Sequence, residues 1–161
     1  MIGFGYDIHR LAAGESLIIG GVHFADAPLG TVAHSDGDVL LHAIMDALLG
    51  ALAAGDIGRH FPDTDPRNKN ISSIELLIRV GSLVEAHHMD IVNIDSTVVL
   101  ERPKLRDHVQ QMRTNIAKAL QLQIHQVSVK ATTSEGVGLV GREEGIAAHA
   151  VCQLNQRSSR P

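Results

Sequence analysis

Apolar and polar residues alternate along the first ten positions of the chain. One parity carries large apolar side chains, at Ile2, Phe4, Tyr6 and Ile8. The other parity carries two glycines followed by Asp7 and His9. A period of two is typical of a β-strand, so we predict a strand over residues 2–10. Asp7 and His9 then point to the same side of that strand.

Further strands are predicted from a glycine turn and from the same alternation. Residues 16–19 and 22–24 are predicted to form a hairpin, because Gly20 and Gly21 between them permit the positive φ angles of a tight turn. Alternating apolar residues predict three more strands, over residues 92–100, 127–131 and 146–154.

Helical spacing of apolar residues marks three segments. The first helix is expected to begin near Asp36, with Ser35 and Asp36 as capping residues, and to end near Ala54. The second should cover residues 72–88 behind a Ser-x-x-Glu capping box, and the third residues 105–120. Residues 56–70 are predicted to form a loop. The resulting fold is α/β (α+β), a mixed β-sheet with helices packed on one side.

Length and composition limit the class of protein. The 161 residues, 44% of them hydrophobic, suffice for a single domain over 1–156 with a loose tail over 157–161. A net charge of −4 without runs of Lys or Arg argues against nucleic-acid binding. The single Cys152 excludes a disulfide within the chain and favours a reducing compartment. Without a signal-type or membrane-length apolar segment, we expect a cytoplasmic protein with no membrane contact.

The first predicted helix carries a polar stripe. Asp38, His42 and Asp46 follow one another every four residues, which stacks them on one face, and apolar residues occupy most of the rest. A solvated face usually carries Lys, Glu, Arg or Gln, so this stripe indicates partners inside the structure. The alternative is a hydrogen-bonded core histidine with aspartates that cap or pair locally. On the stripe alone, that alternative is the stronger interpretation.

Asp7 and His9 favour a metal site. Together with His42 they provide two imidazoles and one carboxylate, the three-ligand set of a catalytic zinc with one position left open for substrate. Gly3 and Gly5 on the same strand face leave room beside them. No spacing rule ties an Asp-x-His motif to His42, so both interpretations stay open at this point.

Three other segments could bind phosphate or a second cation. His34 and Ser35 precede the first helix, whose N–H groups and dipole favour an anion, although Ser35 could equally be a cap. The loop over 55–66 contains three carboxylates, which suit either a functional loop or local capping. The strand end over 130–136 offers hydroxyls and Glu135 for phosphate and a hard cation, or is simply a strand end with surface charges.

Four motifs in order resemble a known enzyme family. GYDIH at 5–9, AHSDGD at 33–38 with His42, GDIG at 55–58 with FPDTD at 61–65, and KATTSE at 130–135 are similar to the 2-C-methyl-D-erythritol 2,4-cyclodiphosphate synthases of the non-mevalonate isoprenoid pathway. The likeness covers about residues 2–154. It implies a homotrimer with active sites at the subunit interfaces, which closes a cytidine-diphosphate substrate to a cyclic diphosphate and releases CMP.

The resemblance also implies a role for individual residues. Asp7, His9 and His42 would bind zinc, and Glu135 from a neighbouring subunit would help to bind magnesium or manganese. Catalytic contacts would come from His34, Ser35 and Thr133, while Asp7, His9 and Glu135 would also contact the substrate. The other substrate-binding residues that it implies are Asp46, Asp56, Gly58, Phe61, Asp63, Leu100, Lys104, Arg106, Ala131, Thr132, Leu139 and Arg142.

Within that set, different parts of the substrate have different contacts. Asp56 and Gly58 would hold the ribose, and residues 100–106 and 131–133 of the neighbour would frame the cytosine. Asp46 and Asp63 would support the site. This sequence departs from the family at two positions: Leu139 replaces a frequent phenylalanine beside Arg142 in a central cavity, and Arg106 replaces an apolar residue.

Two other functions compete with the cyclase. A zinc hydrolase of phosphate esters would use the same three ligands with water as nucleophile. A non-enzymatic module would bind an isoprenoid diphosphate or a pathway partner through the trimer and would keep that binding after His42→Ala.

Overall fold

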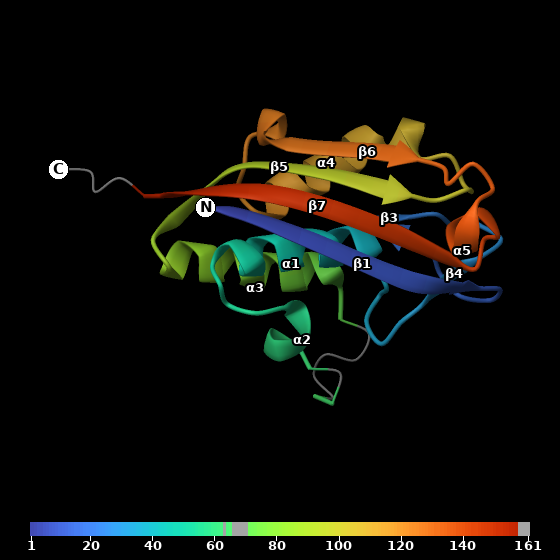
Figure 1. Cartoon of the computed structure of the whole chain (residues 1–161), viewed down its shortest axis with the longest axis horizontal. Coiled ribbons are helices and arrows are strands. Elements are labelled where there is room, and N and C mark those ends of the chain that lie inside the picture. The colour runs from blue at the N-terminus through green and yellow to red at the C-terminus, as the bar shows by residue number, and fades with distance from the viewer. Residues whose placement is uncertain (63, 66–70, 158–161) are drawn as a thin grey trace.

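A computed structural model describes residues 1–62, 64–65 and 71–157 of the chain (Figure 1). Its strands are β1 (Ile2–Ala12), β2 (Ile18–Ile19), β3 (Val22–His23), β4 (Gly30–Val32), β5 (Met89–Val99), β6 (Val127–Thr132) and β7 (Gly145–Gln156). Its helices are α1 (Val39–Ala51), α2 (Ile57–His60), α3 (Ser73–Ala86), α4 (Val109–Ala119) and α5 (Gly138–Gly141), with 3-10 turns at Arg106–His108 and Ile124–Gln126.

The main sheet is mixed, as the sequence predicts. Its strand order is β4-β1-β7-β5-β6, in which β5 and β6 run parallel and the other neighbours run antiparallel. α1, α3 and α4 lie against one face of this sheet (Figure 1). The predicted hairpin is confirmed as β2 and β3, with Gly20 at φ 58° and Gly21 at φ 70°.

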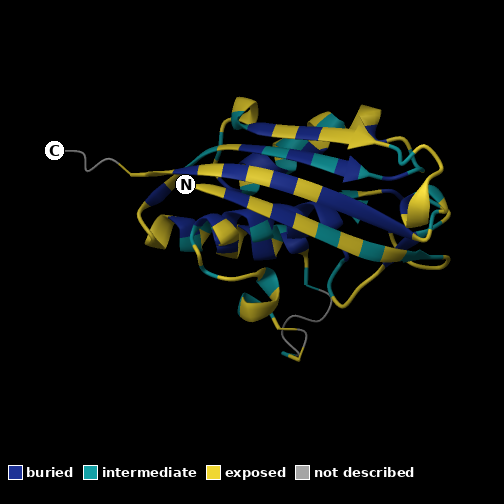
Figure 2. Cartoon of the chain, viewed as in Figure 1, coloured by how far each residue is buried: buried dark blue, intermediate teal, exposed yellow. Residues whose placement is uncertain are grey.

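α1 forms the centre of the core. It packs against β1, β7 and β5 on the sheet side and against α3 on the other, so nearly all of its side chains are buried (Figure 2). This explains why the helix is so apolar in sequence. Cys152 of β7 is fully buried, and burial raises the pKa of its thiol to about 11. The thiol is therefore a core group, as expected, with little thiolate at neutral pH.

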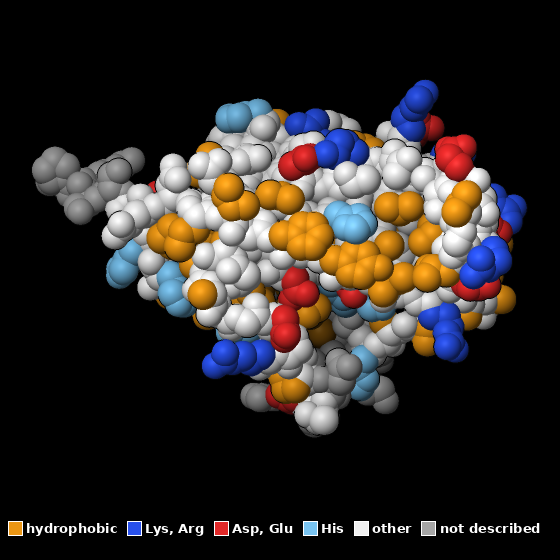
Figure 3. Space-filling view, in the orientation of Figure 1, with side chains coloured by type: hydrophobic (Ala, Val, Ile, Leu, Met, Phe, Trp, Pro, Cys, Tyr) orange, Lys and Arg blue, Asp and Glu red, His pale blue; other side chains and the backbone are white. Residues whose placement is uncertain are grey.

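The two faces of β1 differ in an unexpected way. The glycine parity faces α1, and the large apolar parity faces solvent, with Ile2 74% exposed, Phe4 62% and Tyr6 47%. Apolar side chains gather over β1 and β7 on this outer face of the sheet (Figure 3). Soluble monomers seldom expose a contiguous patch of this kind, so the patch indicates an interaction surface.

The start of α1 differs from the prediction. The cap is Asp38, whose carboxylate accepts a hydrogen bond from Leu41 N at 3.1 Å, and not Ser35 or Asp36. Gly37 has a φ of 69°, which cannot continue a helix, so the chain before Asp38 lies outside α1. The predicted limits of 36–54 are therefore too wide at both ends.

Two further local predictions were wrong. The capping box at the start of α3 does not form, because Ser72 makes no side-chain capping hydrogen bond. The predicted loop over 56–70 contains the short helix α2, and its residues 63 and 66–70 lie outside the described residues. β4 was not predicted, since three residues carry too little periodicity to stand out. None of the helices within the described residues is both long and apolar enough to cross a lipid bilayer.

Candidate active site

Asp7, His9 and His42 meet at one point between β1 and α1. Asp7 Oδ2 lies 2.8 Å from His9 Nε2 and 3.0 Å from His42 Nδ1, and the two ring nitrogens lie 3.1 Å apart. Asp7 and His9 project from the same face of β1, as the alternation predicts, and His42 projects from α1 toward them. The structure thus joins an Asp-x-His motif to a histidine 33 residues away from His9.

Hydrogen bonds and opposite charges together outweigh burial in this cluster. Burial on its own raises the pKa of Asp7, but hydrogen bonds from His42 and His9 and their positive charge outweigh it and hold that pKa well below its ordinary value. Burial lowers the pKa of His42, and the hydrogen bond and charge of Asp7 reverse this and raise it. The site therefore keeps a carboxylate ionised and attracts positive charge.

The donor set fits a divalent metal ion. One ligand atom from each residue lies within 4.8 Å of the others. A tetrahedral zinc with bonds of about 2.0–2.2 Å sets its donor atoms about 3.3–3.6 Å apart, so the three atoms need to separate only slightly to receive an ion. Two imidazoles and one carboxylate are the protein ligands of many catalytic zinc sites, which would leave one position of the ion for a ligand from outside the chain.

A pocket of about 360 Å³ opens directly above these ligands. Its lining includes several residues that the sequence singled out and several that it did not; they are Asp7, His9, Val32, Ala33, His34, Ser35, His42, Ile57, Gly58, Phe61, Ile71 and Leu76. We call this hollow the metal pocket. It combines a polar floor with an apolar wall, an arrangement suited to a small ligand with a charged end.

The prediction of a phosphate at the N-terminus of the first helix stays a prediction, although a side chain of the protein already occupies part of that terminus. The Asp38 carboxylate already accepts a hydrogen bond from Leu41 N there, and it also accepts from Gly20 N at 2.9 Å and Gly21 N at 2.7 Å. His34 and Ser35 line the metal pocket.

Asp46 and Asp56 hold backbone rather than line the metal pocket. Asp46 Oδ1 accepts a hydrogen bond from Ile57 N at 2.8 Å and so ties α2 to α1, and burial raises the pKa of this carboxyl group. Asp56 caps α2 through Arg59 N at 2.9 Å. The contact of Asp46 fits the alternative in which the aspartates of the polar stripe pair locally. Asp63, also predicted for the site, lies outside the described residues.

A second pocket, of about 810 Å³, lies at the other edge of the sheet. We call it the edge pocket; it is lined by Leu100, Pro103, Lys104, Leu105, Arg106, Asp107, Val109, Val129, Lys130, Ala131, Thr132 and Thr133. Of the residues over 100–106 and 131–133 that were predicted to frame a cytosine, all but Glu101 and Arg102 line it. Nearby, Thr133 Oγ1 donates a hydrogen bond of 2.7 Å to Glu135 Oε1, and Glu135 has a φ of 52°.

The two pockets of one chain are far apart. Asp7 pairs with Ala148, which pairs with Val98, which pairs with Ala131, so three strand spacings separate Asp7 from Ala131. At about 4.8 Å per spacing this is about 14 Å. The buried side chains of Val98 and Ala148 fill the space between. Among the described residues, Glu135 does not join the group that could hold a metal.

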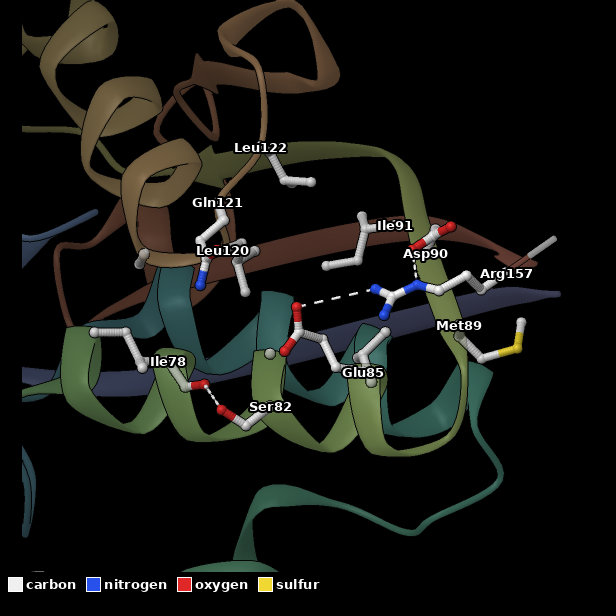
Figure 4. A pocket seen from close by; sticks show the side chains of 13 residues that line it. Ile78, Ser82, Glu85, Met89, Asp90, Ile91, Leu120, Gln121, Leu122 and Arg157 are labelled. Atoms are coloured by element: carbon white, nitrogen blue, oxygen red, sulfur yellow. Dashed lines mark hydrogen bonds and ion pairs between the residues drawn. The ribbon is translucent and has the colours of Figure 1, made fainter. Parts of the chain in front are cut away.

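Leu139 in α5 and Arg142 directly after that helix are not among the residues that line either pocket. Leu139 is 42% exposed, and the Arg142 guanidinium pairs with Glu144 at 2.8 Å, which raises the pKa of Arg142 and lowers that of Glu144. A third hollow, of about 210 Å³, lies between α3, the end of α4 and the start of β5 (Figure 4). There Arg157 is paired with Asp90 at 2.8 Å and Glu85 at 3.9 Å.

Sequence reasoning missed one buried polar residue that contacts His42 beside the metal pocket. Ser73 is fully buried, and its Oγ lies 3.1 Å from His42 Nε2. A serine at the start of a helix gives no sequence signal beyond capping, and the capping prediction fell on Ser72.

Known proteins with similar sequences point to one family. Residues 1–155 match the model of the YgbB family. A protein of Salinibacter ruber named 2-C-methyl-D-erythritol 2,4-cyclodiphosphate synthase is 58% identical over 153 residues, which are 95% of this chain and 97% of that protein.

Solved structures agree with the sequence relatives. One is a 2C-methyl-D-erythritol-2,4-cyclodiphosphate synthase in a form bound to CDP, with a TM-score of 0.88 and 37% identity, covering 96% of this chain and all of the other. Another is the bifunctional IspDF of Campylobacter jejuni, with a TM-score of 0.90 and 42% identity. This chain is covered to 95% but spans only 41% of that bifunctional protein. The chain therefore belongs to the YgbB family.

Proposed function

We propose that this chain converts 4-diphosphocytidyl-2-C-methyl-D-erythritol 2-phosphate to 2-C-methyl-D-erythritol 2,4-cyclodiphosphate and CMP. The observation that carries the proposal is the convergence of Asp7, His9 and His42 at the floor of a pocket, in a chain whose relatives carry the name of this synthase. A related structure is described as bound to CDP. CDP is the CMP that this reaction would release, with one more phosphate.

The reaction needs no protein nucleophile. An oxygen of the 2-phosphate attacks the β-phosphorus of the same molecule, a new P–O bond closes the ring, and the bond from that phosphorus to the bridging oxygen breaks. The electron pair leaves with CMP. Both reacting groups are anionic, so the site must neutralise charge and hold the two ends in line. Orientation of this kind can lower a barrier by about 7–11 kcal/mol.

Asp7, His9 and His42 would hold a zinc ion through Asp7 Oδ2, His9 Nε2 and His42 Nδ1. When bound, the ion supplies Lewis-acid polarisation of a phosphoryl oxygen at its open position. His34 and Ser35 on the wall of the metal pocket would contact the phosphate of the erythritol end. Gly58 and Phe61 close the opposite wall, where Asp56 caps the helix that would approach the ribose.

The cytosine and the second cation would bind to a neighbouring subunit. Within one chain, three strand spacings and the buried side chains of Val98 and Ala148 separate Asp7 from the edge pocket, which has Thr132 and Thr133 in its lining and Glu135 beside it. We therefore infer a homotrimer in which the metal pocket of one subunit faces the edge pocket of the next, with Glu135 binding magnesium or manganese. The exposed apolar face around Phe4 and Tyr6 supports burial of that face in the assembly.

A substrate assay with a histidine variant tests the proposal. Purified protein supplied with zinc and magnesium should release CMP and form a cyclic diphosphate, both followed by ³¹P NMR. His42→Ala should lose bound zinc and at least about 100-fold in turnover, because one of three ligands is missing. His125→Ala, at an exposed position of the turn Ile124–Gln126, is the matched control and should match the wild type.

Labelled water distinguishes the cyclase from a hydrolase with the same ligands. The cyclic product should contain no oxygen from ¹⁸O water, because the nucleophile belongs to the substrate. A linear product that carries solvent oxygen would contradict the proposal, and so would a His42→Ala variant that retains full zinc.

A further inference from the structure

His42 has a second contact on the side of its ring away from the metal ligands. Its Nδ1 faces Asp7 and His9, while its Nε2 lies 3.1 Å from Ser73 Oγ and 3.3 Å from Ser35 Oγ. Metal ligation through Nδ1 requires that atom to be free of a proton. The proton of the neutral ring must then sit on Nε2, and the partners of Nε2 decide whether it stays there.

Ser73 is fixed so that it can only accept from Nε2. Its hydroxyl donates to Asp36 Oδ1 in a short hydrogen bond, and its backbone N–H donates to Asp36 Oδ2 at 2.8 Å. With its own proton directed at the carboxylate, Ser73 Oγ presents a lone pair to His42. Because Ser73 is fully buried, water does not compete for this contact.

Asp36 is itself held in place by the chain around it. Its backbone N–H donates to Ile71 O at 3.3 Å, and its Oδ1 accepts from Asp38 N at 3.3 Å. The loop before α1 thus connects to the first residue of α3. The result is a directed chain of groups that runs from Asp36 through Ser73 to His42.

We propose that Ser73, held by Asp36, is a positioning residue that fixes the ring of His42 with Nδ1 directed at the metal. The inference rests on the metal site in the proposed function and deepens it. It also frees Ser35: a protonated Nε2 does not accept a hydrogen bond, so the Ser35 hydroxyl keeps its proton for a ligand in the metal pocket. Groups that orient a ligating histidine in this way typically change metal affinity by about 10–100-fold when removed.

Asp36→Asn is the sharpest variant because it preserves shape. The asparagine can accept from Ser73 N only through its oxygen, which turns its NH₂ group toward Ser73 Oγ. Ser73 must then redirect its own proton to His42 Nε2, and the ring proton moves to Nδ1, where it blocks the metal. Ser73→Ala instead removes the acceptor and leaves only the longer contact with Ser35.

Zinc affinity without substrate, measured by competition with a chromophoric chelator, provides the test. Ser73→Ala and Asp36→Asn should each bind zinc about 10–100-fold more weakly than the wild type. Ser72→Ala, one residue earlier and exposed, and Asp26→Asn, which removes one negative charge at an exposed position, should bind as the wild type does. Wild-type affinity in both Ser73→Ala and Asp36→Asn would overturn the inference.

A second readout reports the ring directly. In the zinc-loaded protein, ¹H–¹⁵N NMR should find a His42 Nε2 proton that exchanges slowly with solvent in the wild type, because the buried Ser73 Oγ accepts it, and faster in Asp36→Asn. A purely structural role would not change that exchange, and an unchanged exchange rate in Asp36→Asn would overturn the inference even if Ser73→Ala fails to fold. A wild-type chain that binds no zinc would overturn the metal site itself, which separates that failure from one confined to Ser73.

Discussion

Asp38 shows how a single carboxylate joins two parts of the chain. It is fully buried, and it accepts hydrogen bonds from the backbone N–H groups of Gly20, Gly21 and Leu41. The hairpin β2–β3 and the start of α1 are thereby held together. Burial raises the pKa of Asp38 to about 6 in spite of these donors, and the nearby charge of Asp36 adds to the rise.

This shift predicts a pH dependence of stability. The folded pKa of about 6 lies above the ordinary 3.8, so the stabilising contribution of the proton is complete below about 3.8 and is lost as the pH rises through about 6. Asp38→Asn cannot ionise. The free energy of unfolding of the wild type minus that of Asp38→Asn should therefore fall between about pH 4 and pH 7, by at most about 3 kcal/mol.

Urea unfolding at several pH values measures this difference, and Asp26→Asn at an exposed position is the control. A difference that rises with pH would mean that the three backbone donors outweigh burial and hold the pKa of Asp38 below its ordinary value.

At the residue scale, the sequence predicts side chains that obey a local period and misses those positioned by distant partners. Asp7 and His9 follow from strand alternation, and His42 follows from helical spacing. Their convergence is not local, since it depends on how α1 crosses β1. Ser73 gave no signal, because its contact with Asp36 spans 37 residues.

At the scale of elements, two glycines set the distance between β1 and α1. A Cβ atom added at Gly5 would lie 1.9 Å from Ala43 O, and one at Gly3 would lie 1.9 Å from Ala47 O. The space that these glycines leave is therefore filled by the backbone of α1, not by a ligand. This close approach brings His42 within reach of Asp7 and His9.

Gly5→Ala should consequently damage both the fold and the site. Because the clash is with backbone atoms, we expect a loss of at least about 3 kcal/mol in the free energy of unfolding. Zinc affinity should fall as well, since α1 must move away from β1 and carry His42 with it. Urea unfolding and zinc titration of the same preparation measure the two effects.

Gly50→Ala is the matched control for this prediction. Gly50 lies in α1, and the nearest atom to an added Cβ is Phe4 O at 3.8 Å, an ordinary contact. Alanine in a helix should stabilise the chain by about 0.5–1 kcal/mol and leave zinc binding unchanged. A Gly5→Ala protein as stable as the wild type would show that the helix does not depend on this close contact.

Long periodic elements were predictable, and short ones were not. β1, α3 and β7 emerged from many residues with one period, whereas β4 and α2 are a few residues long and exist because of their neighbours. β4 pairs with the end of β1, and α2 is tied to Asp46. Both elements help to line the metal pocket or adjoin it, so part of the site was beyond local sequence reasoning.

At the scale of the whole molecule, the two pockets that the proposed substrate would use lie apart in one chain. The metal pocket and the edge pocket lie toward opposite edges of one sheet, and the apolar face of β1 is left exposed. Both features have one physical explanation if copies of the chain pack through that face. The assembly would bury apolar side chains and bring complementary pockets together.

Mixing two inactive variants tests this arrangement. His42→Ala removes one ligand of the metal site, and Glu135→Ala removes the proposed ligand of the second cation. Each variant alone should be inactive. In randomly mixed trimers, a site that takes its metal pocket from a Glu135→Ala chain and its edge from a His42→Ala chain is intact. Random assembly from an equal mixture should make about three quarters of the trimers mixed, and each mixed trimer contains one intact site out of three. About one quarter of wild-type sites should therefore be restored. Phe4→Asp in both chains should abolish the recovery, because it places charge in the apolar face. If mass measurement confirms mixed trimers of the parent variants and activity still does not recover, the sites are not shared.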